Sequence, residues 1–347
     1  MGIDANLVHH LGVTARVSEL GGVLCTLGEP TMHCDELATD RALEAAGLHG
    51  PPDVTLYRRL GFNGVESVDV SASGGSRHIL DLNAPGVPEH LRGRFDAVYN
   101  GGTLEHIFDI RSALRNIFEL LAPGGVVIHS GPANGWLEHG FYQFSPTLLV
   151  DYYIANRFEV LQALVHERVH DEGDAVLVHT YLPDIDLGQR VRGRCGFYMP
   201  FRKRPESTWD VLPQQRYYAS LHGMDDAVTS AWPVRYAPPY RLEGGVRSGA
   251  PATFTVIPSP VHAEGHQWVV PVPDMTGASD SLGNNTSRLM LFEDRIPIGP
   301  PHSQHGAIRR LGQGRYSHWH DSLLFSPTRN DDARTHVYEY AASPHDL

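Results

Sequence analysis

Cysteine is scarce in this chain, which has three cysteines, Cys25, Cys34 and Cys195, among its 347 residues. Their spacing matches neither a disulfide framework nor a metal-binding motif, so we expect reduced thiols. Signals for membranes and secretion are also lacking. No run of eighteen apolar residues occurs, and the start MGIDANLVHH has no basic region followed by an apolar one. These absences predict a cytoplasmic protein with no membrane partner.

Basic residues are fewer than acidic ones, with 28 Lys and Arg against 40 Asp and Glu, and the formal net charge is −12. A protein that binds nucleic acid without sequence preference needs a basic face, so we expect no nucleic-acid partner. The GxSxG, HExxH, P-loop and paired CxxC motifs are absent as well. Their absence disfavours hydrolase, NTPase and zinc-ribbon interpretations.

The most informative stretch that the chain does contain spans residues 95–125. Phe95–Tyr99 is a short apolar run that predicts a buried strand, and the sequence Asn-Gly-Gly ends it. We expect Thr103 to cap the following helix, whose apolar residues recur at three- and four-residue spacing. Val126–His129 then begins another strand. Strand, loop, helix and strand form one unit of a parallel sheet, and ligands bind at the carboxyl ends of such strands, where residues 100–106 fall.

The sequence of this stretch resembles that of class I S-adenosylmethionine (SAM)-dependent methyltransferases. That family often reads FD-V-----LEH---D at its fourth strand and LKPGG before its fifth. The matching residues here are Phe95, Asp96, Val98, Leu104, Glu105, His106, Asp109, Leu121, Pro123, Gly124 and Gly125. The resemblance covers roughly the first 200 residues. It implies an α/β fold with a Rossmann-like sheet, S-adenosylmethionine as the cofactor, and methyl transfer as the reaction.

The remaining elements of such a sheet can be placed along the chain. We expect strands at 22–27, 65–70 and 77–80, and helices over 1–21, 35–48 and from 145 onward. Two further strands, 158–166 and 175–181, are expected to form an antiparallel hairpin. In the family this hairpin closes the sheet, with its seventh strand inserted between the fifth and the sixth. We therefore expect a methyltransferase-like domain over 1–205, a connector over 206–224 and a β-rich domain over 225–347.

The resemblance also implies a cofactor site. Gly28 follows the first strand, where a Cβ would block the approach of the methionine part of the cofactor. The family has two or three glycines at this turn and this chain has one, so an ordinary turn is the alternative interpretation. Asp69 ends the second strand, where a carboxylate can accept both ribose hydroxyls; its alternative is a solvated acidic residue. The remaining implied contacts follow the third and fourth strands: Asp81, Leu82, Asn100, Gly101 and Gly102.

The loop 131–144 follows the fifth strand, so it should form one wall of the acceptor pocket. Methyl transfer to oxygen needs a base near the acceptor, and a histidine can be neutral and basic near pH 7. His139 and His106 are the candidates, with structural packing as the alternative, while Glu105 could hold a substrate hydroxyl or the loop itself. Three aromatic residues of the loop could pack against an apolar or sugar face: Trp136, Phe141 and Tyr142.

Two other regions admit both a structural and a functional interpretation. Residues 187–204 are basic, as in a solvated connector or as in a clamp for an anionic acceptor. Short runs with frequent turns predict a small β-sandwich or barrel near the C-terminus, at 254–257, 267–272, 287–292, 295–298, 306–310, 316–319 and 322–325.

The C-terminal region also carries clustered histidines and aromatic residues. The segment 308–328 is rich in aromatic residues, as in a glycan-binding surface or a packed interior. His302, His305, His318 and His320 have a spacing that could serve a metal. The chain has 21 histidines, which makes chance clusters common, so we expect no metal site.

The sequence thus predicts a SAM-dependent methyltransferase, and more narrowly an O-methyltransferase that acts on a hydroxyl of a small polar molecule or sugar. The phrase HGFYQFSPTLLVDYYIANRFE resembles a subgroup associated with bacterial polysaccharide and secondary-metabolite gene clusters, which indicates a biosynthetic role. The alternative is a non-catalytic binding or scaffolding protein on a decayed methyltransferase fold, with glycan binding as one form of it. The sequence indicates no oligomeric state.

Overall fold

The computed structural model describes residues 2–51, 54–72, 74–169, 173–181, 191, 193–216, 218, 237–248, 254–272, 279–281, 284–294 and 296–343. The chain divides into two compact units. The N-terminal unit comprises Met1–Val178, Val191–Pro233 and Leu242–Arg247, and the C-terminal unit comprises His179–Arg190, Val234–Arg241 and Ser248–Leu347. The chain therefore passes between the units more than once. The domain limits expected near residues 205 and 225 stay predictions.

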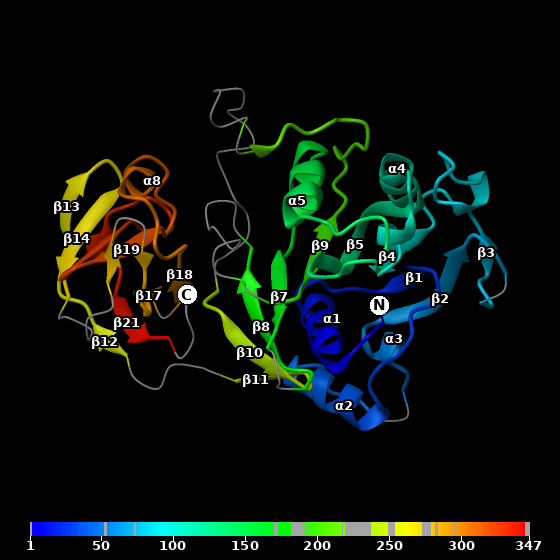
Figure 1. Ribbon diagram of the computed structural model, residues 1–347, viewed down its shortest axis with the longest axis horizontal. Helices are drawn as coiled ribbons and strands as arrows, with labels where there is room; N and C mark the ends of the chain where they lie inside the picture. Colours follow the sequence, from blue (N-terminus) through cyan, green and yellow to red (C-terminus); the bar gives the residue numbers. More distant parts are fainter. Residues whose placement is uncertain are drawn as a thin grey trace. The chain divides into compact units, whose positions relative to one another are not determined.

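The largest sheet has the strand order β11-β10-β8-β7-β9-β5-β4-β1-β2-β3, with β6 paired to β9 (Figure 1). Its strands are β1 (Gly22–Leu27), β2 (Phe62–Asp69), β3 (His78–Ile79), β4 (Phe95–Gly101), β5 (Leu121–Asn134), β6 (Glu159–Val160), β7 (Leu164–Arg168), β8 (Val176–Thr180), β9 (Cys195–Arg202), β10 (Tyr240–Glu243) and β11 (Val246–Ser248).

The strands from β1 to β5 run parallel to one another, as the apolar runs and their turns predicted. In the register, Leu27 of β1 pairs with Val68 of β2, and Gly101 of β4 pairs with Ser130 of β5. Parallel strands end at the same edge of a sheet. The turns that follow β1, β2, β4 and β5 therefore leave the sheet together, and this edge carries most of the expected site residues.

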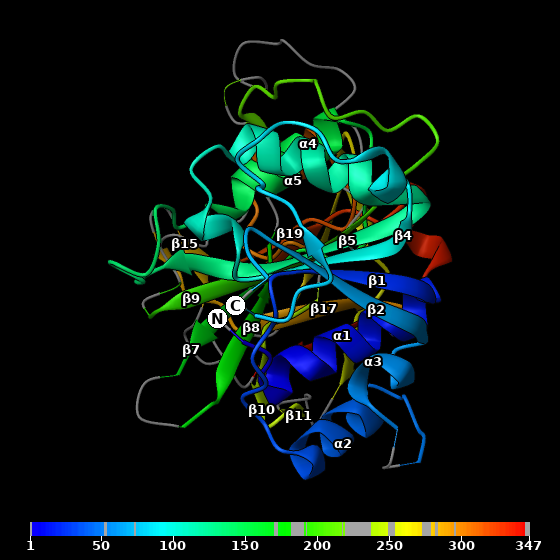
Figure 2. The ribbon, with the colours of Figure 1, turned by 90° about the vertical axis from the view of Figure 1, so that its right-hand side faces the viewer.

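Helices cover both faces of this sheet and give three layers. Figure 2 shows α1 (Ala5–Ser18), α2 (Glu36–Ala45) and α3 (Leu56–Arg59) on one face, and α4 (Ile110–Leu120) and α5 (Pro146–Ala155) on the other. Asp4 and Asp35 cap α1 and α2, because each side chain accepts a hydrogen bond from a backbone N–H of the first turn. The expected α/β fold with a Rossmann-like sheet is confirmed. None of the helices in the described part of the chain has the length and apolar composition needed to cross a membrane.

The segment between β4 and α4 differs from the expectation that Thr103 caps a helix. A short 3₁₀ turn, η2 (Leu104–His106), comes first, and α4 begins only at Ile110. Asp109 caps α4 by accepting a hydrogen bond from the backbone N–H of Ser112 at 3.0 Å. The hydroxyl of Thr103 is unavailable for capping because it donates to the carbonyl oxygen of Leu27 at 2.6 Å. Thr103 therefore ties the turn after β4 to the end of β1.

The strands expected at 158–166 and 175–181 are present as β6 and β7 and as β8, and β7 and β8 are neighbours in the sheet. The strand inserted beside β5, however, is β9 and not residues 175–181, so this part of the prediction was wrong. β9 runs antiparallel to β5 and to β7, between which it lies. The basic residues of 187–204 concealed it, because they flank a buried apolar run. At the end of β9, Arg202 donates to Ser18 O at 2.9 Å, and Lys203 donates to Phe118 O and Leu121 O at 2.8 Å each. These side chains hold neighbouring elements, while Arg190 and Arg192 lie outside the described residues.

The C-terminal unit contains two sheets. One has β12 (Thr255–Val256), β21 (Tyr338–Ala342), β17 (Leu289–Glu293) and β18 (Ile296–Ile298) in that order. The other has β13 (Val261–Glu264), β14 (Gln267–Pro271), β20 (Ser322–Phe325), β19 (Tyr316–Trp319), β15 (Asp280–Ser281) and β16 (Asn284–Asn285). One apolar core includes Trp268 and Leu323 from the second sheet and Leu291 and Tyr338 from the first. A shared core between two sheets makes this unit a β-sandwich.

Two details of the C-terminal unit correct or refine the sequence interpretation. Residues 306–310, expected as a strand, belong to the helix α8 (His305–Arg310). This unit also has a short 3₁₀ turn, η3 (Ala333–Thr335), whereas η1 (Glu89–Leu91) belongs to the N-terminal unit. Tyr316 and His318 of the aromatic segment are buried, and His318 Nδ1 lies 2.8 Å from the hydroxyl of Ser287. Packing therefore accounts for these two residues without a glycan surface.

Candidate active site at the carboxyl edge of the sheet

Three strand ends are joined at the carboxyl edge of the sheet. The backbone N–H of Gly28, after β1, donates to Val68 O on β2 at 2.8 Å. Thr103, after β4, donates through its hydroxyl to Leu27 O at 2.6 Å. The structure thus brings Gly28, Asp69 and Thr103 to one place. Thr103 was not among the expected site residues.

Gly28 has a backbone conformation that suits glycine, with a φ angle of +72°. A Cβ built there would lie 3.5 Å from Thr103 Oγ1 and 3.7 Å from Asp69 Oδ2. A larger side chain would therefore fill the space between the ends of β2 and β4. A cavity of about 190 Å³ adjoins this turn, and its lining includes Thr26, Glu29 and Ser67. Gly28 therefore leaves this edge of the sheet free of a side chain.

The two acidic residues expected at the cofactor site have different surroundings. Asp69 is half-buried, and its carboxylate accepts a hydrogen bond from the backbone of Ser71 at 3.4 Å. Asp81 is exposed and closes its own turn, because its Oδ1 accepts from the backbone N–H of Asn83 at 2.9 Å. Asn83 in turn accepts from the backbone of Phe108 and Asp109 at 3.1 Å each. The turn after β3 is therefore attached to the segment before α4.

Leu82, Gly101 and Gly102 also have defined positions. Leu82 exposes 5 % of its surface, so its side chain packs inside the protein, and its carbonyl accepts from the amide of Asn116 at 3.2 Å. Gly101 lies against the ring of Tyr99, where a Cβ would come within 2.6 Å. Gly102 follows directly and turns the chain away from β4 with a φ angle of +94°.

Asn100 is buried, and its side chain holds the turn after β4 by hydrogen bonds. Its Oδ1 accepts hydrogen bonds from the backbone N–H groups of Thr103 at 3.0 Å and Leu104 at 3.1 Å. Its Nδ2 therefore faces Nδ1 of His129 on β5, at 3.2 Å. Because an amide N–H₂ only donates, Nδ1 of His129 is the acceptor and Nε2 carries the hydrogen. That nitrogen then donates to the hydroxyl of Tyr153 at 2.7 Å.

The buried imidazole of His129 stays neutral in this chain of hydrogen bonds. Burial lowers the pKa of His129 to about 3, because the charged form would lose its hydration without gaining a negative partner. A neutral ring can accept at one nitrogen and donate at the other, as the two contacts require. The tautomer of His129 thus follows from the orientation of the Asn100 amide.

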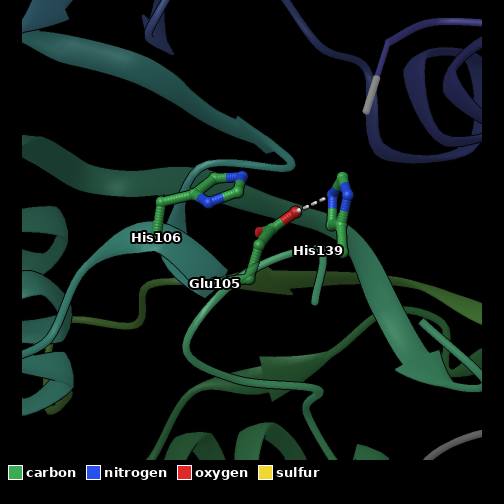
Figure 3. Close-up of side chains that lie close together, drawn as sticks. All are labelled: Glu105, His106 and His139. Carbon is green, nitrogen blue, oxygen red and sulfur yellow. Dashed lines mark ion pairs between the residues drawn. The ribbon is translucent and has the colours of Figure 1, made fainter. Parts of the chain in front are cut away.

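Glu105, His106 and His139 lie together at the same edge (Figure 3). They were expected as candidates from two different loops. Glu105 is 0 % exposed, and its Oε1 lies 3.5 Å from Nε2 of His139, whose side chain is 29 % exposed. The rings of His106 and His139 have centroids 5.3 Å apart. Figure 3 shows the carboxylate of Glu105 directed between the two imidazole rings.

The loop after β5 is fixed over Glu105 by backbone contacts. The N–H of Phe141 donates to the carbonyl oxygen of Glu105 at 2.8 Å. Gly140 permits this approach, because a Cβ there would lie 2.7 Å from the same oxygen. At the start of the loop, the indole of Trp136 donates to Cys195 O on β9 at 2.8 Å, and its ring centroid lies 5.5 Å from that of His139. These contacts place His139 beside Glu105.

Aromatic side chains surround the outer part of this loop. Phe141 is 66 % exposed and meets the ring of Phe108 edge to face, with centroids 5.7 Å apart. The hydroxyl of Tyr142 donates to Phe108 O at 2.9 Å. An exposed aromatic pair of this kind offers apolar surface near the histidines. Phe108 was not expected from the sequence, where it follows the LEH residues without a motif of its own.

The carboxylate of Glu105 is in an unfavourable electrostatic position. Within the described residues, neither of its oxygens accepts a hydrogen bond, and both are inaccessible to solvent. A buried charge without partners costs several kcal/mol, and the nearest basic group is the imidazole of His139. The geometry therefore favours a cationic or proton-donating group beside Glu105.

Comparison with known proteins supports the fold and the family. Residues 33–171 match the model of a methyltransferase-domain family, over a span that runs from before α2 to just past β7. The matched residues lie within the N-terminal unit. This match and the strand order support a class I SAM-dependent methyltransferase fold for the N-terminal unit. The open turn at Gly28, with the carboxylate of Asp69 beside it, fits S-adenosylmethionine, the cofactor that the sequence resemblance implies.

Two solved structures are similar to parts of the chain at low identity. The 1,6-didemethyltoxoflavin N1-methyltransferase of Burkholderia thailandensis shares 15 % identity, covering 57 % of this chain and 79 % of its own, with a TM-score of 0.33. A SAM-dependent methyltransferase of Mesorhizobium loti shares 13 % identity, covering 56 % of this chain and 98 % of its own, with a TM-score of 0.33. No curated protein matches the sequence.

Proposed function

We propose that the methyltransferase domain transfers a methyl group to a hydroxyl of a small polar molecule or sugar. The observation that carries this proposal is the contact between buried Glu105, which follows β4, and His139 in the loop after β5. Oε1 of Glu105 lies 3.5 Å from Nε2 of His139. An amine acceptor can attack with its own lone pair, whereas a hydroxyl gains from losing its proton as it reacts. A carboxylate beside an imidazole at the ligand edge of the sheet is suited to that proton transfer.

The residues of the β1, β2 and β4 turns would hold the cofactor. Gly28 allows the ligand to approach the backbone, and Asp69 can accept hydrogen bonds from the two ribose hydroxyls. Asp81, Gly101 and Gly102 line neighbouring turns, and Asn100 shapes the β4 turn by holding two of its N–H groups. When bound, the cofactor supplies a methyl group that is already activated as a sulfonium substituent.

The residues of the β5 loop would hold and activate the acceptor. His139 is the proposed base, and Glu105 orients its ring from the buried side. His106, which lies beside it, is the second candidate. Phe141, Tyr142 and Trp136 provide aromatic surface on which an apolar or sugar face can pack. Holding the acceptor oxygen in line with the methyl group is the main contribution expected of this loop.

The test uses the full chain with S-adenosylmethionine and two matched panels, one of sugars and hydroxylated small molecules and one of amines. We expect methyl transfer to the hydroxyl panel, and roughly 10²–10⁴-fold lower turnover in His139→Ala with nearly unchanged cofactor affinity. His49→Ala, an exposed histidine remote in sequence from the loop, is the control and should keep full turnover.

Three outcomes would contradict parts of the proposal. Transfer to amines alone would overturn the hydroxyl acceptor. Normal turnover in His139→Ala would remove that residue as the base and leave His106. A folded chain that binds neither S-adenosylmethionine nor S-adenosylhomocysteine in calorimetric titration would favour the non-catalytic binding role instead.

A further inference from the structure

We propose that Glu105, His106 and His139 form a binding site for one divalent first-row transition-metal ion. From the sequence we expected no metal site, because 21 histidines make chance clusters common, and these three residues were not considered as ligands. In the structure, one ligand atom from each residue lies within 4.8 Å of the others. The set consists of one carboxylate oxygen and two imidazole nitrogens.

The ligand types indicate the class of ion. Two imidazoles with one carboxylate occur at catalytic zinc centres and at non-haem iron centres. Mg²⁺ and Ca²⁺ prefer oxygen ligands alone, so these ions fit the set poorly. Zn²⁺, Fe²⁺, Co²⁺ or Ni²⁺ are the ions that this arrangement is suited to bind.

The spacing is close to that of a loaded site. Around a tetrahedral ion, ligand atoms bound at about 2.0–2.2 Å lie roughly 3.3–3.6 Å apart. The Glu105–His139 pair, at 3.5 Å, already has this separation, so His106 is the ligand that must move closer from within the outer limit of 4.8 Å. His106 is exposed, so its ring is free of the packing that would prevent such a rotation. Figure 3 shows its ring on the opposite side of the Glu105 carboxylate from His139.

The buried carboxylate supplies an independent reason for a cation. Neither oxygen of Glu105 accepts a hydrogen bond within the described residues, although the side chain is 0 % exposed. The same domain shows how a buried carboxylate is otherwise satisfied. Glu66 receives hydrogen bonds from Arg94 at 2.6 and 3.0 Å and contacts His78 at 2.7 Å. A metal ion would give Glu105 the compensation that Arg94 gives Glu66.

The cluster is also reachable from solvent. Glu105 forms its buried end, while His106 is exposed and His139 is 29 % exposed. Three protein ligands leave at least one coordination position for water or for an oxygen of a second molecule. If the proposed hydroxyl acceptor holds, the ion would lower the pKa of an acceptor hydroxyl bound at that position. His139 would then serve as a metal ligand, which replaces the base role given to it above.

The test measures metal binding directly and needs no methyl acceptor. The full chain is stripped with a chelator, dialysed, and titrated with Co²⁺ and with Zn²⁺, followed by calorimetry and by the visible spectrum of bound Co²⁺. We expect the wild type to bind one more ion per chain than Glu105→Gln or His139→Ala. His106→Ala should retain the site with at least about tenfold weaker affinity. His49→Ala should bind as many ions as the wild type. This control excludes the explanation that removal of any exposed histidine lowers metal binding.

Thermal unfolding gives a second readout. Zn²⁺ should raise the Tm of the wild type and of His49→Ala, but leave that of Glu105→Gln unchanged. If Glu105→Gln does not fold, the comparison rests on His106→Ala, whose exposed side chain can be removed without a cavity. Equal stoichiometry and affinity in the wild type and the His106 and His139 variants would overturn the proposal. Methyl transfer by a metal-free chain would overturn the ion's part in activation and leave the proposed function intact. Metal binding without methyl transfer to any acceptor would contradict the proposed function and leave the metal site intact.

Discussion

Nδ2 of Asn100 lies 3.2 Å from Nδ1 of His129, and this contact joins the turn after β4 to the neighbouring strand β5. The other end of the Asn100 amide holds the N–H groups of Thr103 and Leu104. The shape of the turn that leads into Glu105 and His106 therefore depends on an imidazole that is buried and neutral. A proton on His129 would remove the acceptor that Asn100 needs.

The first prediction concerns the pH dependence of stability. The pKa of His129 is about 3 in the folded chain and near its usual 6.5 in the unfolded chain. Above pH 6.5 both forms are neutral, and as the pH falls from 6.5 toward 3 only the unfolded chain gains the proton. The free energy of unfolding should therefore fall by up to about 1.4 kcal/mol per pH unit from this residue.

The matched variant for this test is His129→Gln, which has donor and acceptor groups but does not titrate. Urea unfolding between pH 7 and pH 4 should show a shallower loss of stability in His129→Gln than in the wild type. Burial also lowers the pKa of His10, and that residue contributes equally to both proteins. Parallel pH profiles would show that His129 is not the buried neutral group we describe.

The second prediction concerns the cofactor. Asp69→Ala should weaken binding of S-adenosylmethionine by roughly 1.5–3 kcal/mol, the usual cost of losing a charged hydrogen-bonding partner. Calorimetric titration with the cofactor and with S-adenosylhomocysteine measures the change, since both carry the ribose hydroxyls. Circular dichroism confirms that the variant is folded. An affinity equal to that of the wild type would remove Asp69 from the site.

The third prediction concerns the loop over Glu105. In Gly140→Ala the new Cβ would lie 2.7 Å from Glu105 O and 3.2 Å from Glu105 Cβ, so the loop must shift. We expect turnover and metal binding to fall, with unchanged cofactor affinity and a loss of stability of about 1–3 kcal/mol from overpacking. Gly306→Ala is the control, because its Cβ would meet nothing within 4 Å. Normal turnover in Gly140→Ala would show that the loop position does not matter.

The fourth prediction concerns the domain limit near residue 205. Asn156, after α5, accepts from Val211 N at 3.0 Å and donates to Val211 O at 3.0 Å, and the Tyr152 hydroxyl donates to Trp209 O at 2.9 Å. A chain ending at residue 216 should therefore be more stable than one ending at 205, and both should unfold cooperatively. A truncated chain that is molten while the full chain folds would show that this unit needs residues beyond 216, such as β10 and β11, and that the predicted limit is wrong.

Local patterns predicted much of the methyltransferase fold. Apolar runs bounded by glycine or asparagine located β1, β4 and β5, because buried parallel strands need little else. β9 was missed because its partners β5 and β7 are remote in sequence and its flanks are basic. The α8 helix was missed because Gly306 opens a run that reads as a turn followed by a strand.

The candidate site was predictable as residues but not as an arrangement. Glu105, His106 and His139 were named from their loops, since the carboxyl edge of a parallel sheet collects its ligands. Their contact depends on the path of residues 136–144. Two contacts set this path: the indole of Trp136 donates a hydrogen bond to Cys195 O, and Gly140 packs closely against Glu105. Asn83 and His129 could have been suspected from the sequence only weakly. His129 is a polar residue inside an apolar run, and Asn83 is a polar residue just beyond one. Which atoms they would join is a tertiary property.

The position of β9 has a consequence for synthesis of the chain. The strand Cys195–Arg202 fills the gap between β5 and β7, yet it follows both in the sequence. While the ribosome extends the chain, β5 and β7 are therefore made before the strand that joins them, and each presents an unpaired edge. The sheet can close only after residue 202 has emerged, so folding of this domain should be rate-limited by a late, long-range pairing. Until then the nascent chain offers two strand edges to chaperones or to other nascent chains.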